Sequence, residues 1–320
     1  MNLGIVFLVL FSVVGSLGIC PPYSQHSPCT CRTITDRIGE DFSILTCEGL
    51  QSEDELLGVL EPTRGVPMFE LELVNTSLRY IPHDAFKETT YQVLSIRDSR
   101  ISALSDLDVA FAGLEDHLHL IEVINCSYTS SWDWTQLGNL QHLLEIQVVD
   151  SELIDVTKGL ASIQHLDMEA FAFHRNNIQR LADEAFAKFT NLERLALDNN
   201  FLTEVKRSMF PKPARLLKIL GLSYNLLETF PADMFRDMPS LKTLYLTGNP
   251  FHTLDEVVFK PVWRQLHLVL FHDTRLSCDC RITWLAQEDN SRKYIHGQCH
   301  GPTNFRGRNI HSVQAHELWC

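Results

Sequence analysis

The chain has 320 residues, 45% of them hydrophobic, so it is long enough to bury a large core. Its 40 Asp and Glu residues outnumber its 27 Lys and Arg residues, which gives a formal net charge of −13 at pH 7. Because binding to phosphate backbones depends on clustered Lys and Arg, this balance argues against nucleic acid as a partner.

Residues 1–18 are expected to be a signal peptide. Residues 2–18 carry no charge and end in small residues at Ser16 and Gly18, where signal peptidase cleaves. The basic residue that usually stands near the start of such a segment is missing, and an uncleaved anchor is the alternative. No second apolar run of spanning length follows, so we expect no membrane span and no glycolipid anchor after cleavage. The predicted location is therefore secreted and extracellular.

Eight of the nine cysteines cluster near the ends of the chain, as expected for an oxidising compartment. Four cysteines near the N-terminus and four near the C-terminus predict two small disulfide-bonded regions, separated by a long segment without disulfides. A zinc site at Cys278-Asp-Cys280 would need regular ligand spacing and reducing conditions, so we reject it. The eight are Cys20, Cys29, Cys31, Cys47, Cys278, Cys280, Cys299 and Cys320.

The middle of the chain is an internal repeat. Its clearest unit runs from Leu192 through Leu195 and Leu197 to Asn200, and apolar residues recur at the same spacing in the neighbouring units. Each of the four clearest units also has a phenylalanine ten residues after its asparagine. We call the residue at the asparagine position the anchor. The predicted anchors are Thr76, Ser99, Cys126, Ser151, Asn176, Asn200, Asn225, Asn249 and Asp273.

Alternation of apolar residues before each anchor predicts one strand per unit, with one face buried. This pattern resembles the extracellular leucine-rich-repeat family. The resemblance implies an α/β solenoid: a curved horseshoe with a parallel sheet on its concave side and a disulfide-stapled cap at each end. The predicted parts are a signal peptide at 1–18, an N-terminal cysteine cap and link at 19–67, about nine repeats at 68–275 and a C-terminal cysteine cap at 276–320.

The cysteine spacings resemble the caps of the same family, and the pairing of that family implies four disulfides. A narrower resemblance lies in the N-terminal cap and in the link that follows it, which are similar to arthropod secreted proteins named after the non-catalytic leucine-rich subunit of Oplophorus luciferase. That likeness implies an accessory subunit that associates with a separate secreted catalytic chain. The implied disulfides are Cys20–Cys31, Cys29–Cys47, Cys278–Cys299 and Cys280–Cys320.

No motif for catalysis is present. The chain lacks a nucleophile elbow, a zinc-protease HExxH, a phosphate-binding loop and a dinucleotide fingerprint. Its 14 histidines, including His117 and His119, show no regular ligand spacing and are interpreted as surface residues. We therefore predict a protein that is not an enzyme and that has no cofactor and no metal.

Function is then expected on the exposed concave face of the sheet, with another protein as the ligand. The outward positions are acidic in the first four units and contain small residues and aromatics further on. Two N-glycosylation acceptors, Asn75 and Asn125, each precede an anchor in the acidic half. Glycans there would crowd that half, so the partner is predicted to use the other one. The candidate partner-binding residues are His174, Arg175, Arg194, Asp198, Tyr224, Tyr245 and Phe271.

Three functions remain open: a secreted protein-binding or scaffold protein, the accessory subunit of a secreted enzyme complex, and the truncated ectodomain of an adhesion or immune receptor. Cys126 raises a separate question, since it could be a nucleophile, a metal ligand or a link to another chain. It occupies an anchor position, where a side chain points inward. We therefore predict a buried free thiol that packs as a small hydrophobe.

Overall fold

The computed structural model describes residues 20–21, 28–37, 39–156, 159–163, 167–288 and 293–318. The predicted signal peptide and Cys320 lie outside the described residues. Within the described part, no helix is both long and apolar enough to cross a membrane.

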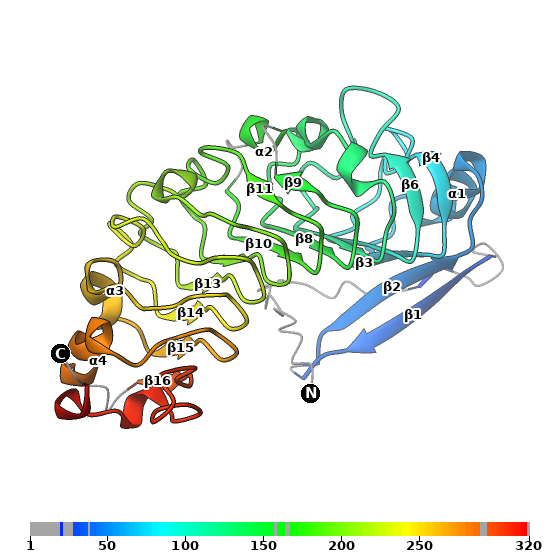
Figure 1. The fold of residues 1–320 in the computed structure, drawn as a ribbon. Coiled ribbons are helices and arrows are strands. Elements are labelled where there is room, and N and C mark those ends of the chain that lie inside the picture. Colours follow the sequence, from blue (N-terminus) through cyan, green and yellow to red (C-terminus); the bar gives the residue numbers. More distant parts are fainter. Residues whose placement is uncertain are drawn as a thin grey trace.

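The structure is a curved solenoid whose inner side is a sheet of 12 described strands (Figure 1). Strand β1 pairs with β2 in the antiparallel direction, and every later neighbour in this sheet pairs in parallel. The strands in spatial order are β1 (Cys29–Thr35), β2 (Asp41–Glu48), β3 (Glu70–Val74), β5 (Val93–Arg97), β7 (Leu120–Ile124), β8 (Glu145–Val149), β10 (Ala170–His174), β12 (Arg194–Ala196), β13 (Ile219–Gly221), β14 (Thr243–Tyr245), β15 (Leu268–Leu270) and β16 (Tyr294–His296).

Short elements make up the remainder of each coil. Two small parallel pairs join β4 (Ser77–Tyr80) to β6 (Arg100–Ala103) and β9 (Asp155–Val156) to β11 (Arg180–Leu181). The α-helices are α1 (Glu53–Leu60), α2 (Gly159–Ser162), α3 (Glu256–Trp263) and α4 (Thr283–Gln287). The 3₁₀ helices are η2 (Glu61–Thr63), η3 (Thr129–Ser131), η4 (Trp134–Leu137), η5 (Arg207–Met209), η6 (Cys280–Ile282), η7 (Ile310–Ser312) and η8 (Ala315–Glu317).

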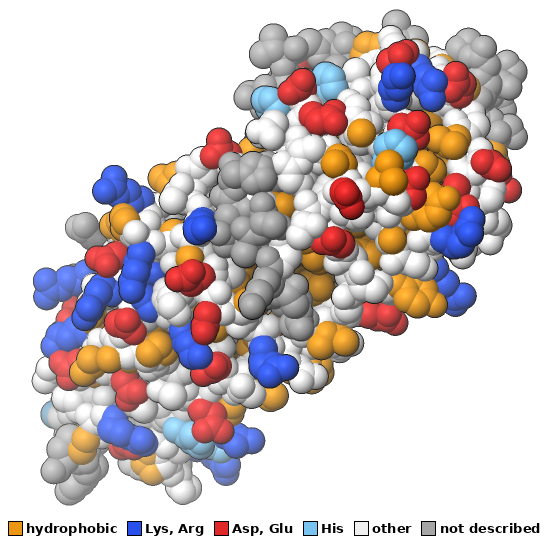
Figure 2. All heavy atoms as spheres, turned by 90° about the horizontal axis from the view of Figure 1, so that it is seen from above, with side chains coloured by type: hydrophobic (Ala, Val, Ile, Leu, Met, Phe, Trp, Pro, Cys, Tyr) orange, Lys and Arg blue, Asp and Glu red, His pale blue; other side chains and the backbone are white. Residues whose placement is uncertain are grey.

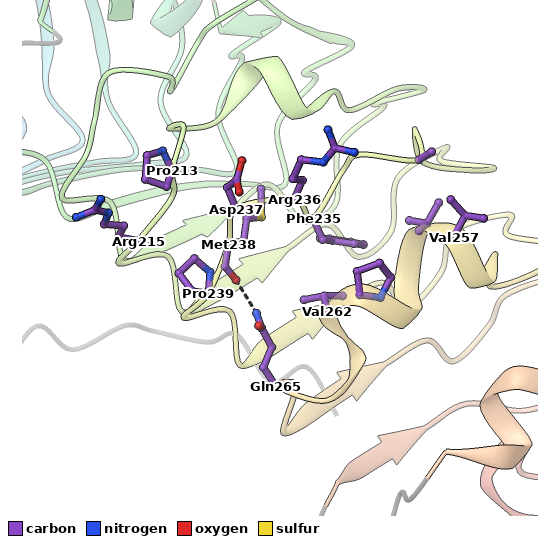
Figure 3. A pocket seen from close by; sticks show the side chains of 13 residues that line it. Pro213, Arg215, Phe235, Arg236, Asp237, Met238, Pro239, Val257, Val262 and Gln265 are labelled. Atoms are coloured by element: carbon purple, nitrogen blue, oxygen red, sulfur yellow. Dashed lines mark hydrogen bonds between the residues drawn. The ribbon is translucent and has the colours of Figure 1, made fainter.

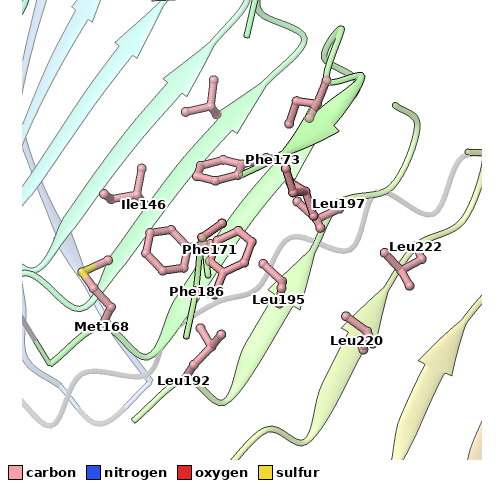
Figure 4. Close-up of a cluster of buried hydrophobic side chains, with 14 of the residues drawn as sticks. Ile146, Met168, Phe171, Phe173, Phe186, Leu192, Leu195, Leu197, Leu220 and Leu222 are labelled. Atoms are coloured by element: carbon pink, nitrogen blue, oxygen red, sulfur yellow. The ribbon is translucent and has the colours of Figure 1, made fainter. Parts of the chain in front are cut away.

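The core runs through the solenoid between the sheet and its convex side. In each coil the alternate strand residues point inward, as Leu195 and Leu197 do, and both are fully buried (Figure 4). The phenylalanines ten residues after the anchors are also buried, and Phe235 and Phe259 of successive coils lie 5.5 Å apart between ring centroids. Since a single coil cannot enclose its own apolar residues, stacking supplies the missing walls.

The anchor side chains form a second, polar ladder inside the turns. The Asn225 carboxamide oxygen accepts the Leu202 N–H at 3.0 Å, while its nitrogen donates to the Leu197 carbonyl at 2.9 Å. The residue before the anchor adopts a positive φ in eight non-glycine cases and at Gly248. Each turn thereby satisfies buried backbone groups that its own coil leaves unpaired.

Cys126 occupies its anchor position as predicted. Its side chain is 3% exposed, and its thiol donates to the carbonyls of Ile96 at 3.4 Å and Ile124 at 3.3 Å. Burial raises the pKa of this thiol to about 11, so the reactive thiolate is scarce at neutral pH. Among the described cysteines it forms no disulfide. The prediction of a buried free thiol is confirmed.

The ninth coil corrects the predicted register by one residue. Thr243 pairs with Leu268 and Tyr245 with Leu270, which makes Thr274 the anchor in place of Asp273. Asp273 has the positive φ of a residue before an anchor, and the Thr274 hydroxyl donates to a backbone carbonyl inside the turn. A shift of one residue moves every side chain of a strand to the opposite face.

Both ends of the sheet carry disulfides. The structure contains the pairs Cys20–Cys31, Cys29–Cys47 and Cys278–Cys299. Cys280 is also disulfide-bonded, but its predicted partner Cys320 lies outside the described residues. Helix α1, which begins after the N-cap Ser52, occupies the link between the N-terminal cysteines and the first coil. Strand β16 adds a tenth rung from the C-terminal cap to the nine repeat strands.

Candidate binding face

The acidic residues of the chain are unevenly distributed along the solenoid. Residues 1–166 hold 23 Asp and Glu against 8 Lys and Arg, whereas residues 167–320 hold 17 against 19. On the concave face of the first coils, Glu72 accepts from Arg32 at 3.3 Å, and Glu122 accepts from Arg97 at 2.7 Å. The N-terminal half of the face is therefore acidic with local ion pairs.

Glu70 lies within this acidic group. Burial, followed by repulsion from Glu72 and Glu122, raises its pKa to about 7. The carboxyl group is therefore about half protonated at neutral pH. A raised carboxyl pKa means that the ionised form destabilises the fold as pH rises.

Two ion pairs and one contact between a histidine and a carboxylate hold the centre of the concave face together. The Arg175 guanidinium donates two hydrogen bonds to Asp150, at 2.6 and 2.7 Å. Arg194 of β12 reaches across β10 to the buried Glu145 of β8 at 3.3 Å. Each predicted site residue here thus has a partner within the chain.

His174 and Asp198 form the third contact, with 3.5 Å between the imidazole Nδ1 and the carboxylate. Burial and the neighbouring Arg175 lower the His174 pKa to about 4, so this imidazole is neutral at pH 7. Burial raises the Asp198 pKa to about 6, although its carboxylate accepts the Ser223 N–H at 2.7 Å. Desolvation acts on both groups in the direction that disfavours charge.

The C-terminal strands β13–β16 present an uncharged surface, which we call the neutral patch. In each strand the central residue is buried and its two neighbours face the concave side. Tyr294 is 61% exposed, and its ring lies 4.0 Å from that of His296 between centroids. The neutral patch consists of Ile219, Gly221, Thr243, Tyr245, Leu268, Leu270, Tyr294 and His296.

Phe271 does not belong to this face, so its prediction as a partner-binding residue was wrong. It is 1% exposed, and its ring packs on Gly297 so tightly that a Cβ there would lie 2.0 Å from a ring carbon. Because the register of the ninth coil differs by one residue from the predicted one, Leu268 and Leu270 face the concave side instead of Phe271. Sequence reasoning also missed Tyr294 and His296, because they belong to the cap and carry no repeat signal.

Tyr224 lies at the edge of the face, where its ring covers Gly248 of the next coil. Phe201 and Leu226 lie at equivalent positions after adjacent anchors, and all three side chains are 49% exposed. Sequence reasoning selected Tyr224 but not its two apolar neighbours. The signal was available, since both residues directly follow an anchor and face away from the core.

The two predicted glycosylation acceptors occupy the same position in the first and third coils. Asn75 and Asn125 are exposed, have φ of 49° and 52°, and stand just outside the strand ends. The Asn125 amide donates to Asp98 at 2.6 Å. A glycan on either asparagine would therefore project from the edge of the acidic half.

In the described part of the chain, no three His, Cys, Asp or Glu side chains lie close enough together to hold a metal ion. The face offers ion pairs in its N-terminal and central coils and apolar or aromatic side chains in its last coils.

Parallel coils of about 24 residues, buried leucines, an asparagine ladder and disulfides at both ends define a leucine-rich-repeat solenoid fold with disulfide-bonded caps. The Leucine rich repeat family matches residues 190–251. The fold predicted from the sequence is thus confirmed.

The chain is similar to several leucine-rich proteins. One is the Oplophorus-luciferin 2-monooxygenase non-catalytic subunit of Oplophorus gracilirostris, which is 20% identical over 93% of this chain and 88% of that protein. Another is leucine-rich repeat and fibronectin type III domain-containing protein 1 of Danio rerio, 26% identical over 50% of this chain but only 24% of that protein. A chain from the octameric complex of Latrophilin 3, Unc5D and FLRT2 (LRR) shares the fold, with a TM-score of 0.61 at 20% identity over 90% of this chain and 98% of that chain.

Proposed function

We propose that this chain is a secreted, non-enzymatic protein that recognises a protein partner through the C-terminal half of its concave face. The observation that carries the proposal is the neutral patch, eight outward positions without one Asp, Glu, Lys or Arg in a chain of net charge −13. Interface centres are depleted in charge and enriched in aromatic residues. The patch offers Tyr245, Tyr294 and two leucines on a rigid sheet.

The remainder of the concave face also favours the C-terminal half as the binding site. The central pairs between Arg175 and Asp150 and between Arg194 and Glu145 are already satisfied, so they offer a polar border to the patch. Glycans on Asn75 and Asn125 would occupy the opposite half. Both the glycosylation and the secretion that it requires are parts of the proposal, as is the signal peptide at 1–18.

The test begins with native affinity purification and mass spectrometry to identify the partner, whose affinity is then measured. The double substitution Tyr245→Ala with Leu270→Ala is expected to weaken binding at least tenfold, since each substitution removes an apolar contact from the interface. Glu72→Ala with Glu122→Ala is the matched control and should leave the affinity within about twofold. Normal binding by the first pair and loss of binding by the second would refute the proposal.

A second function is favoured by one observation, the likeness along 93% of this chain to a subunit described as non-catalytic. In that case the partner is a separate secreted catalytic chain. Purification from the native secretion decides between the two functions. If a small enzyme co-purifies at a fixed ratio, the chain is an accessory subunit. If the chain purifies with another protein and without an enzyme, it is a recognition protein.

A further inference from the structure

A groove of about 720 Å³ lies on the outer side of the C-terminal coils, away from the concave face (Figure 3). Its walls come from the outer segments of two successive coils and from helix α3. Buried Phe235, Met238, Val258 and Val262 form an apolar floor, while Val257 is 67% exposed at the rim. A space of this size can hold several side chains of a peptide.

The groove is preformed. Three prolines from three coils line it, namely Pro213, Pro239 and Pro261, and each ring fixes its own backbone φ. The fully buried Arg207 donates to the carbonyls of Pro211 at 2.7 Å and Arg236 at 2.5 Å, which ties two wall segments together. A ligand would therefore bind without first ordering these walls, which lowers the entropic cost of binding.

Polar groups border the apolar floor, namely the exposed side chains of Arg215, Arg236 and Asp237 and the Val257 carbonyl. Arg215 and Arg236 are exposed and form no ion pair with any described residue. Pro261 has no N–H, so the Val257 carbonyl four residues earlier lacks its helical donor. Figure 3 shows Arg215 and Val257 at opposite ends of the groove. On the face seen in Figure 2, Lys and Arg side chains are more numerous over the C-terminal coils than over the N-terminal ones.

We propose that this groove is a second binding site, which takes an acidic peptide segment of a protein partner with apolar side chains between its carboxylates. The apolar floor would contact the hydrophobic side chains, and the two guanidinium groups would each donate paired hydrogen bonds to a carboxylate. The Val257 carbonyl can receive a peptide N–H, which a fatty acid lacks. The site is independent of the neutral patch, so the chain would hold two partners or two parts of one.

Fluorescence anisotropy with three labelled peptides tests the site at about 0.15 M salt, where long-range attraction is screened. The first peptide has two leucines flanked by glutamates, the second has lysines in place of the glutamates, and the third has serines in place of the leucines. Only the first is expected to bind. Arg215→Glu with Arg236→Glu should weaken it at least tenfold and allow the lysine peptide to bind, whereas Lys188→Glu, outside the groove, should change neither.

Equal binding of all three peptides, no binding of the first up to about 1 mM, or an unchanged affinity in the double variant would overturn the proposal. Laurate that competes for the groove more strongly than the first peptide would assign it to a lipid instead. Self-association that disappears in the double variant would assign it to a second copy of the chain, and would likewise overturn the proposal. Both arginines are exposed, so their substitution leaves the fold intact.

Discussion

Replacing Phe271 and Leu270 separately tests the register on which the neutral patch depends. Phe271 is 1% exposed, and its ring fills the space over Gly297 of the C-terminal cap. Phe271→Ala should therefore lower the free energy of unfolding by about 3–5 kcal/mol, the usual cost of a buried phenylalanine. Leu270 faces the open concave side, so Leu270→Ala should cost less than about 1 kcal/mol.

Guanidinium unfolding followed by tryptophan fluorescence measures both changes, with Leu268→Ala as a control on the same outward row. The order is what matters: a larger loss for Leu270→Ala than for Phe271→Ala would show that the register is wrong. Maleimide labelling gives an independent readout in a Cys126→Ser background. Leu270→Cys should label rapidly in the native protein and Phe271→Cys should not.

Three further outcomes follow from the geometry. Asn225→Ala should cost on the order of 1–3 kcal/mol in unfolding free energy, because it leaves the buried N–H of Leu202 without an acceptor, whereas the Leu197 carbonyl keeps the hydrogen bond from Asn200; an unchanged stability would contradict the ladder. Cys126→Ser should change stability by about 1 kcal/mol or less, since serine already serves as an anchor in two coils, and native Cys126 should resist maleimide. Glu70→Gln should stabilise the fold at pH 8 by up to about 3 kcal/mol and have little effect at pH 4, because the ionised carboxylate is disfavoured as pH rises from 4.5 through about 7; equal effects at both pH values would refute the raised pKa.

Much of the architecture follows from local pattern. Leu195, Leu197 and Asn200 could be assigned to a strand and a turn because the same spacing recurs in adjacent coils, and repetition separates a real period from chance. The burial of Cys126 followed from the same spacing. The disulfide pairs came from the likeness of the cysteine spacing to a known family, since spacing alone leaves several pairings open.

The candidate site was only partly accessible to such reasoning. Arg194 and Glu145 are 49 residues apart in the chain, and their contact depends on the stacking of coils. In the ninth coil Leu268, Val269, Leu270 and Phe271 are all apolar, so hydrophobicity could not distinguish inward from outward residues. Hydrogen-bonded pairing with β14 decided the register there.

By itself, the sequence determined the repeat, the caps, the buried spine and the acidic character of the first half, because each depends on residue type at a fixed spacing. The tertiary structure decided which side chains meet across coils, that the cap contributes Tyr294 and His296 to the sheet, and that three coils enclose a groove at α3. These features arise between coils, where neighbours in space are about 25 residues apart in the chain, and no local pattern encodes them.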